Sequence, residues 1–447
     1  MLSNLVARPR LTAVLIVIIV LVIIAAGFGI SVLLRQGATA PAEARLRTAA
    51  EERPSSATDQ LISETQAKVD AAPEDAGGHA VLGAAYLQLA RETGDPANYG
   101  RAEASLDRAI ELDPDNLQAL IAQGSLSLSR HEFDEALRLG ERALAINDTI
   151  PRVYGLIGDA EVELGRYEAA VRTIQTMVDL RPDLASYSRV AYLRELHGDL
   201  SGAIDAMQQA VSAGGGNVEN TEYVRVQLGN LHFAVGDLTA AERAYAESLA
   251  HLADYPYALA GMARVRAAQG DVPDAIELFE RASARIPVPE FIIGLGETLE
   301  AAGRADEAAD QYALVGAIGQ LLEANGVRQD LEIAAFLAEH GEDPDAAVTR
   351  ARSAFAVRPT VFAADALAWA LHVAGNEPEA AEFADQALRL ETASSLLLYH
   401  AGVIAAANGE TDIARDRLRR ALALNPDFSP LHAPRAEAAL AALDAGP

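Results

Sequence analysis

Residues 151–183 carry the hydrophobic pattern of two short amphipathic helices joined by a turn. Gly165 stands between the two halves, where the turn needs a residue that tolerates unusual backbone angles. Pro182 closes the unit because proline cannot continue a helix interior. Each helix has one apolar face and cannot bury it alone, so the pattern predicts a helical hairpin that needs neighbours. The positions that recur at helical spacing are Tyr154, Ile157, Gly158 and Glu161, then Ala170, Ile174 and Met177.

The same pattern recurs along most of the chain. Three columns of small residues keep a fixed spacing to one another, and together they predict ten units over residues 76–428. The alanine column is Ala102, Ala136, Ala170, Ala203, Ala241, Ala275, Ala308, Ala346, Ala380 and Ala414. Twelve residues before the last nine alanines stand Gly124, Gly158, Ala191, Gly229, Ala263, Gly296, Ala334, Ala368 and Gly402. Turn glycines stand five residues before most of them, at Gly165, Gly198, Gly236, Gly270, Gly303, Gly341, Gly375 and Gly409.

Close packing explains these columns, because only glycine or alanine lets the backbones of two crossing helices approach. The columns resemble the tetratricopeptide repeat family, whose pattern covers about 34 residues. In the first unit the matching residues are Leu82, Gly83, Tyr86, Ala102, Leu106, Ala109 and Pro114. The resemblance implies an all-α, right-handed superhelical solenoid of about ten helix-turn-helix repeats. It also implies that ligands bind along a concave surface lined by the first helix of each repeat.

The repeat array is flanked by segments of different composition. Residues 11–34 are 24 consecutive uncharged and mainly apolar residues, and about 20 suffice for a transmembrane helix. We therefore predict a short tail at 1–10, a transmembrane helix at 11–34 and a flexible linker at 35–57. Helical patterns at 58–75 and at 429–447 predict capping helices that cover the apolar ends of the array.

The charges around residues 11–34 bear on membrane orientation. Arg8, Arg10 and the amino terminus precede the run, whereas only Arg35 directly follows it. This asymmetry favours a single-pass inner or plasma membrane protein with a cytoplasmic N-terminus and extracytoplasmic repeats. Further arginines beyond residue 44 weaken the asymmetry, so a cytoplasm-facing adaptor that recruits a soluble enzyme or protease stays the alternative. Lys68 is the only lysine among 36 basic residues, which suggests a high-GC, bacterial source.

The composition of the chain excludes several kinds of partner and of catalytic or metal site. The formal charge is −28, and the part after residue 35 carries 33 − 64 = −31, which argues against nucleic acid as a partner. Without cysteine, disulfides, thiolate catalysis and cysteine-bound zinc are excluded. The nine histidines form no HExxH pair, and neither a GK[ST] loop nor a GxSxG motif occurs. We predict no enzymatic activity, no cofactor and no metal.

The function expected from this sequence is a non-catalytic, membrane-anchored scaffold or adaptor in envelope biogenesis, secretion or protein maturation. The partner would be a protein or peptide held in the concave groove, where aromatic anchors stand beside polar side chains. Trp369 could instead pack against the adjacent helix. The candidate groove residues are Asp159, Tyr192, Asn230, Arg264, Glu297, Trp369 and His372.

Three insertions interrupt the regular spacing, at residues 92–100, 212–221 and 316–330. Insertions in such arrays map to loops that bend the solenoid or contact a partner. Longer surface loops also cost little and are often simply tolerated. The sequence leaves these alternatives open.

Overall fold

The computed structural model describes residues 56–216, 218–341 and 343–445. The apolar run at 11–34, the tail before it and nearly all of the linker lie outside these described residues. Within the described ranges, no helix is both long enough and apolar enough to cross a bilayer.

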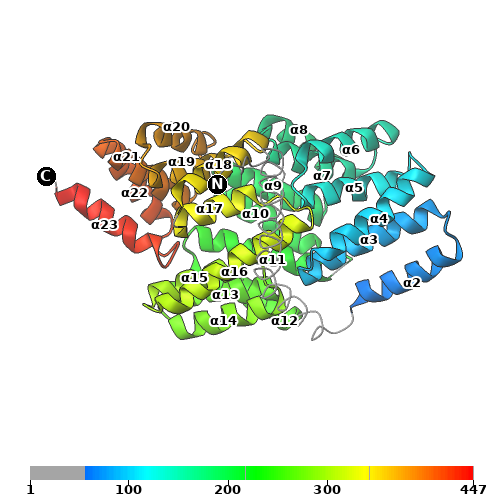
Figure 1. The fold of residues 1–447 in the computed structure, drawn as a ribbon, viewed down its shortest axis with the longest axis horizontal. Helices are drawn as coiled ribbons and strands as arrows, with labels where there is room; N and C mark the ends of the chain where they lie inside the picture. Colours follow the sequence, from blue (N-terminus) through cyan, green and yellow to red (C-terminus); the bar gives the residue numbers. More distant parts are fainter. Residues whose placement is uncertain (1–55, 217, 342, 446–447) are drawn as a thin grey trace, which may run out of the picture.

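The described chain consists of 22 helices, and twenty of them pair consecutively into ten hairpins (Figure 1). The expected all-α solenoid of repeats is thereby confirmed. The first helices of the hairpins are α3 (Ala76–Thr93), α5 (Leu117–Ser129), α7 (Pro151–Glu163), α9 (Leu184–Leu196), α11 (Val218–Ala234), α13 (Pro256–Ala268), α15 (Pro289–Ala301), α17 (Asp330–His340), α19 (Val361–Val373) and α21 (Ser395–Ala407). Their partners are α4 (Ala97–Leu112), α6 (Phe133–Ile146), α8 (Tyr167–Leu180), α10 (Leu200–Ala213), α12 (Leu238–His251), α14 (Val272–Arg285), α16 (Ala305–Ala324), α18 (Pro344–Val357), α20 (Glu377–Ala387) and α22 (Thr411–Leu424). Helices α2 (Ala57–Ala71) and α23 (His432–Ala445) stand at the two ends.

The small residues allow the helices of each hairpin to touch. A Cβ added at Gly229 of α11 would lie 2.5 Å from the ring of Tyr245 in α12, and Ala170 of α8 is fully buried. The alanine column is off by one residue in the eighth hairpin, where Ala347 is fully buried and Ala346 is not. The shift arises because the loop before α18 begins one residue later than the repeat spacing indicates.

The superhelix is wound so tightly that its second turn packs on its first. Four hydrogen bonds or ion pairs join residues 192 to 196 positions apart, so one superhelical turn takes between five and six hairpins. In Figure 1, α18 accordingly lies beside α8. The contacts are Arg358 to Glu163 (2.5 Å), Val361 N–H to the Tyr167 hydroxyl (3.0 Å), the Thr392 hydroxyl to the Leu196 carbonyl (2.6 Å) and the Asn425 amide to the Phe233 carbonyl (2.7 Å).

Three of the turn glycines, Gly165, Gly198 and Gly236, lie at these contacts between superhelical turns. A Cβ at Gly236 would lie 3.3 Å from the Leu424 carbonyl oxygen, and the fit is tighter at the other two. Gly165 and Gly198 have φ angles of 68° and 76°, in the left-handed region that glycine tolerates. A Cβ at Gly165 would lie 2.7 Å from the Pro359 carbonyl oxygen, and one at Gly198 would lie 2.5 Å from the Glu391 carbonyl oxygen. Gly303 has the same backbone geometry, φ 74°, but no neighbour within 4 Å of its Cβ position. The first two glycines therefore serve both the hairpin turn and the approach of the next superhelical turn.

The three insertions also contact the chain itself. A Cβ at Gly94 would lie 2.5 Å from Ile286, and next to it Arg91 donates to Asn220, 2.7 Å away, beside the second insertion. In the third insertion, the Arg328 N–H donates to the Arg130 carbonyl at 3.3 Å. The first and third insertions thus supply contacts between neighbouring superhelical turns, whereas the contact of the second spans only 129 residues.

Replacing Gly165 by alanine should destabilise the protein more than replacing Gly303. Both changes force alanine into the left-handed region at a cost of about 1 kcal/mol, but only Gly165→Ala also places a methyl group against Pro359. We expect a lower Tm for Gly165→Ala and faster hydrogen exchange of the Val361 amide, which donates across the contact. Equal Tm values and equal exchange for the two variants would contradict the stacked arrangement.

Candidate functional site

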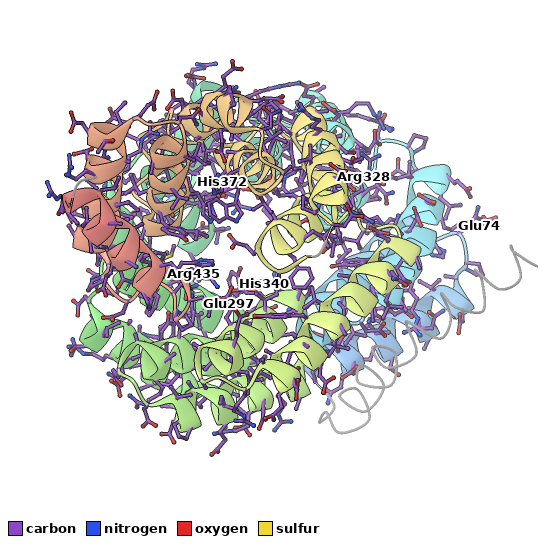
Figure 2. All side chains as sticks on the ribbon, turned by 60° about the vertical axis from the view of Figure 1, so that its left-hand side comes forward. Glu74, Glu297, Arg328, His340, His372 and Arg435 are labelled. Atoms are coloured by element: carbon purple, nitrogen blue, oxygen red, sulfur yellow. The ribbon has the colours of Figure 1, made fainter. Side chains whose placement is uncertain are left out.

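The first helices of the hairpins line the inner side of the superhelix. Successive first helices contact one another directly, as α3 with α5, α17 with α19 and α19 with α21, which places them on the side with the shorter radius. Figure 2 shows Glu297, His340, His372 and Arg435 around the central space. The seven candidate groove residues all belong to first helices, and the structure distributes them over three places.

Asp159 and Tyr192 lie together on α7 and α9. Asp159 accepts two hydrogen bonds from the Arg189 guanidinium, at 2.8 and 2.6 Å. Tyr192 is 36% exposed, and burial of its hydroxyl raises the pKa of the side chain. Both residues line a hollow of about 310 Å³ that also includes Phe133 and Arg358. Because Asp159 is already bound by Arg189, a cationic partner would have to compete for it.

Arg264 and Glu297 line a cavity of about 410 Å³, and Asn230 lies beside Arg264. The Tyr245 hydroxyl donates to Asn230 at 2.7 Å, and Arg264 donates to the same amide oxygen at 2.5 Å. The Arg264 guanidinium also lies 5.2 Å from the centre of the Phe233 ring, an attractive cation–π arrangement. The orientation of Arg264 is therefore fixed by neutral groups.

The wall of this cavity is mainly apolar. The inner helices contribute Arg264 and Glu297 as charged groups, and the segment after α22 closes the opposite side. This combination of apolar walls and a few placed polar groups is typical of ligand sites. Further lining residues are Phe233, Ala267, Ala268, Val272, Phe279, Gly294, Thr298 and Ala301, with Pro426, Asp427, Phe428, Ser429, Pro430, Ala433, Pro434 and Glu437 opposite.

Trp369 and His372 lie on α19, where their rings contact the chain's own side chains. Trp369 is only 8% exposed and stacks on His400 of α21 at 4.2 Å with an interplanar angle of 15°. The Nδ1 atom of His372 lies 2.9 Å from the Glu377 carboxylate. The tryptophan ring therefore offers little free surface to a partner in this arrangement.

A buried polar cluster beside Trp369 was missed by the sequence interpretation, which treated the histidines as scattered. His400 Nδ1 lies 3.0 Å from Asp365, and its Nε2 lies 2.8 Å from Glu339. On α23, His432 Nε2 lies 3.4 Å from the same Glu339 carboxylate. The available signal was spacing: Asp365, His400 and His432 follow one another at 35 and 32 residues, close to one repeat.

The cluster perturbs the protonation of its members. Burial alone would lower the pKa of His400, but the carboxylates of Asp365 and Glu339 outweigh it and raise that pKa to about 10. Burial would likewise raise the pKa of Glu339, whereas the adjacent histidines, His400 foremost, lower it to about 2. His400 is thus a buried cation between two carboxylates. Such paired buried charges are stable only when each partner is present.

No group of three or more histidine, aspartate or glutamate side chains in the described ranges has an arrangement that could hold a metal ion.

Comparison with known proteins identifies the repeats. Family models described as tetratricopeptide repeat match residues 87–149, 156–218 and 232–291. Among curated proteins, the mitochondrial import receptor subunit TOM70 of Rattus norvegicus and of Homo sapiens is 28% identical over 96 residues, which is 21% of this chain. The matched part spans only 16% of the length of those relatives.

Solved structures with helical repeats are also similar, at low sequence identity. YrrB, a tetratricopeptide repeat protein with an unusual peptide-binding site, is 18% identical, with a TM-score of 0.30, over 44% of this chain and 97% of its own. Yeast Tom70 is 14% identical, with a TM-score of 0.36, over 87% of this chain and 96% of its own. Scores this low do not establish a shared overall shape.

Stability should fall as the pH is raised above neutrality, through loss of the His400 charge. Because the folded-state pKa of about 10 exceeds the value of about 6.5 for an unfolded chain, this contribution is full below pH 6.5 and is lost as pH rises through 10. We expect the Tm to decrease between pH 7 and 10, with a smaller decrease in His400→Gln.

The variant His79→Gln is the matched control, because His79 is half-buried and lies outside the cluster, 3.0 Å from the Pro73 carbonyl oxygen; it should retain the native pH dependence. Glu195, whose pKa is raised to about 7 by burial, titrates in all three proteins, so the difference between the variants reports the contribution of His400. The same decrease in His400→Gln as in the native chain would contradict the assignment.

Proposed function

We propose that this chain, a tetratricopeptide repeat protein, is a non-catalytic scaffold that binds a segment of another protein on the inner surface of its superhelix. Repeats of this type present an extended concave surface, and stability comes from neighbouring hairpins rather than from one core. Their conserved geometry supplies a binding surface and no set of reacting groups. The function proposed is accordingly recognition of a partner protein.

The cavity between α13, α15 and the segment after α22 is the observation that carries this proposal. Its volume of about 410 Å³ accommodates one or two large side chains of a bound segment. Arg264 offers guanidinium donors at one place on the wall. Glu297, whose carboxylate lies 3.4 Å from His340, offers an acceptor at another. An apolar anchor residue flanked by polar groups fits these surroundings.

The apolar run at residues 11–34 supports a membrane-anchored version of this scaffold. In the proposed arrangement the N-terminus is cytoplasmic and the repeats are extracytoplasmic, where they hold partners during envelope biogenesis, secretion or protein maturation. The arginines before the run support this orientation.

The alternative is a cytoplasm-facing adaptor that recruits a soluble enzyme or protease. The arginines that follow the run beyond residue 44 favour this second orientation. Both versions use the same inner surface, and they differ in the compartment from which the partner comes.

A photoreactive amino acid at position 264 should crosslink to the partner in native membranes. The matched control is position 172, on the second helix α8, where Arg172 is exposed and faces away from the inner surface. We expect a discrete crosslinked protein from position 264, identified by mass spectrometry, and at least tenfold less from position 172. Equal yields from the two positions would contradict binding on the inner surface.

A reporter fused after Pro447 separates the two orientations. Alkaline phosphatase, which is active only outside the cytoplasm, should be active in this fusion, whereas a fluorescent protein that folds only in the cytoplasm should stay dark. The opposite result would favour the cytoplasm-facing adaptor and exclude the proposed role on the outer side.

A further inference from the structure

The C-terminal segment, Asn425 to Arg435, crosses the inner space of the superhelix. It leaves α22 and passes along helices that precede it by more than one hundred residues. Asn425 is 1% exposed and its amide donates to the Phe233 carbonyl of α11. The next residues form one side of the 410 Å³ cavity opposite α13 and α15. The segment therefore covers part of the inner surface proposed to bind the partner, beside the cavity that stays open.

Two side chains at the start of α23, those of Arg435 and His432, face carboxylates of the inner helices. Burial lowers the pKa of His432, so Arg435 is the cation of this pair at neutral pH. Arg435 Nη2 lies 3.5 Å from Glu300 of α15, and His432 Nε2 lies 3.4 Å from Glu339 of α17. Glu300 also accepts a hydrogen bond from the Tyr312 hydroxyl at 2.9 Å. The inner surface at α15 and α17 thus carries carboxylates, and the segment that covers it places Arg435 opposite Glu300, although Asp427 and Glu437 of the same segment line the cavity.

The segment combines an extended stretch with a helix. Pro426 and Pro430 restrict the backbone before α23, and the Phe428 ring lies between them, 6.1 Å from the Tyr399 ring. Helix α23 then follows and packs its apolar side on α22. The surface is thus covered by an aromatic stretch between prolines, followed by a helix with a half-exposed cation, Arg435.

We propose that residues 426–435 are an intramolecular occupant of the partner-binding surface, and that the partner displaces them with a segment of the same chemistry. That segment carries prolines around an aromatic residue, followed by a helix with a basic side chain opposite Glu300. This inference rests on the proposed function, because it assigns the partner to the same inner surface. It adds an autoinhibitory contact and the chemical class of the partner segment.

The contacts that hold the segment in place can be replaced by those of a similar partner segment. The Arg435–Glu300 pair is half exposed, with 50% and 35% of the side-chain areas accessible, and such pairs add little stability. The apolar side of α23 covers the last hairpin, so its loss without replacement would be costly. A partner helix of the same kind would cover that hairpin in turn. Displacement by a similar segment therefore replaces the lost contacts.

A labelled peptide of the sequence Pro426–Ala445 tests the inference in trans by fluorescence anisotropy. Against the native full chain it competes with the attached segment, so binding should be weak. The Arg435→Glu variant places a like charge beside Glu300 and should bind the peptide at least tenfold more tightly. The matched control Arg420→Glu alters a pair within α22, Arg420 with Asp416, and should bind as the native chain does.

A locked variant provides the reverse test. The chain has no cysteine, so Glu300→Cys with Arg435→Cys introduces the only two thiols, which a bismaleimide can join. Crosslinking should reduce peptide binding at least tenfold relative to the same variant before crosslinking. Crosslinking Arg304→Cys, the residue before α16, to Glu307→Cys in its first turn should leave peptide binding of that variant unchanged.

Two results would overturn the inference. The first is a peptide affinity of Arg435→Glu within twofold of that of the native chain, or no peptide binding to either protein. The second is peptide binding to the crosslinked variant as tight as before crosslinking. Either leaves the scaffold proposal standing if position 264 still crosslinks a partner. Conversely, loss of that crosslink with intact peptide competition would contradict the scaffold function alone.

Discussion

Packing of one superhelical turn against the next is the constraint on which the rest of the structure depends. The turn at Gly165 approaches the Pro359 backbone so closely that no Cβ fits between them. Arg358 reinforces the contact through ion pairs with Glu163 and Glu332 and lies over the Phe133 ring. This contact sets the number of hairpins in one turn, and hence which inner helices face each other.

The candidate site follows from that winding. Asn425 reaches Phe233, 192 residues away in sequence, because the second turn lies directly on the first. Without this register, the segment after α22 would not face α13 and α15, and the cavity beside Arg264 would have no opposite wall. Several inner charges are already paired within the chain, such as Asp159 with Arg189, so the proposed partner would have to replace existing contacts.

The sequence was sufficient for the hairpins but not for their winding. Small-residue columns report contacts inside a hairpin, and they correctly indicated the close approach at positions such as Gly229. The pitch depends on loop geometry, including that of the three insertions, which carries no periodic signal. The sequence was likewise sufficient for only part of the candidate site. Arg264 and Glu297 could be placed together from their columns, whereas Glu339 meets His400 and His432 from three different helices.

The most direct test of the stacked superhelix is the distance between its two turns in solution. Spin labels at Glu168→Cys on α8 and Gln386→Cys on α20, both exposed positions, are the only thiol sites in this cysteine-free chain. Double electron–electron resonance should give one narrow, short distance distribution, which broadens and lengthens when Arg358 is also replaced by alanine. A broad, long distribution in the chain that retains Arg358 would contradict the account.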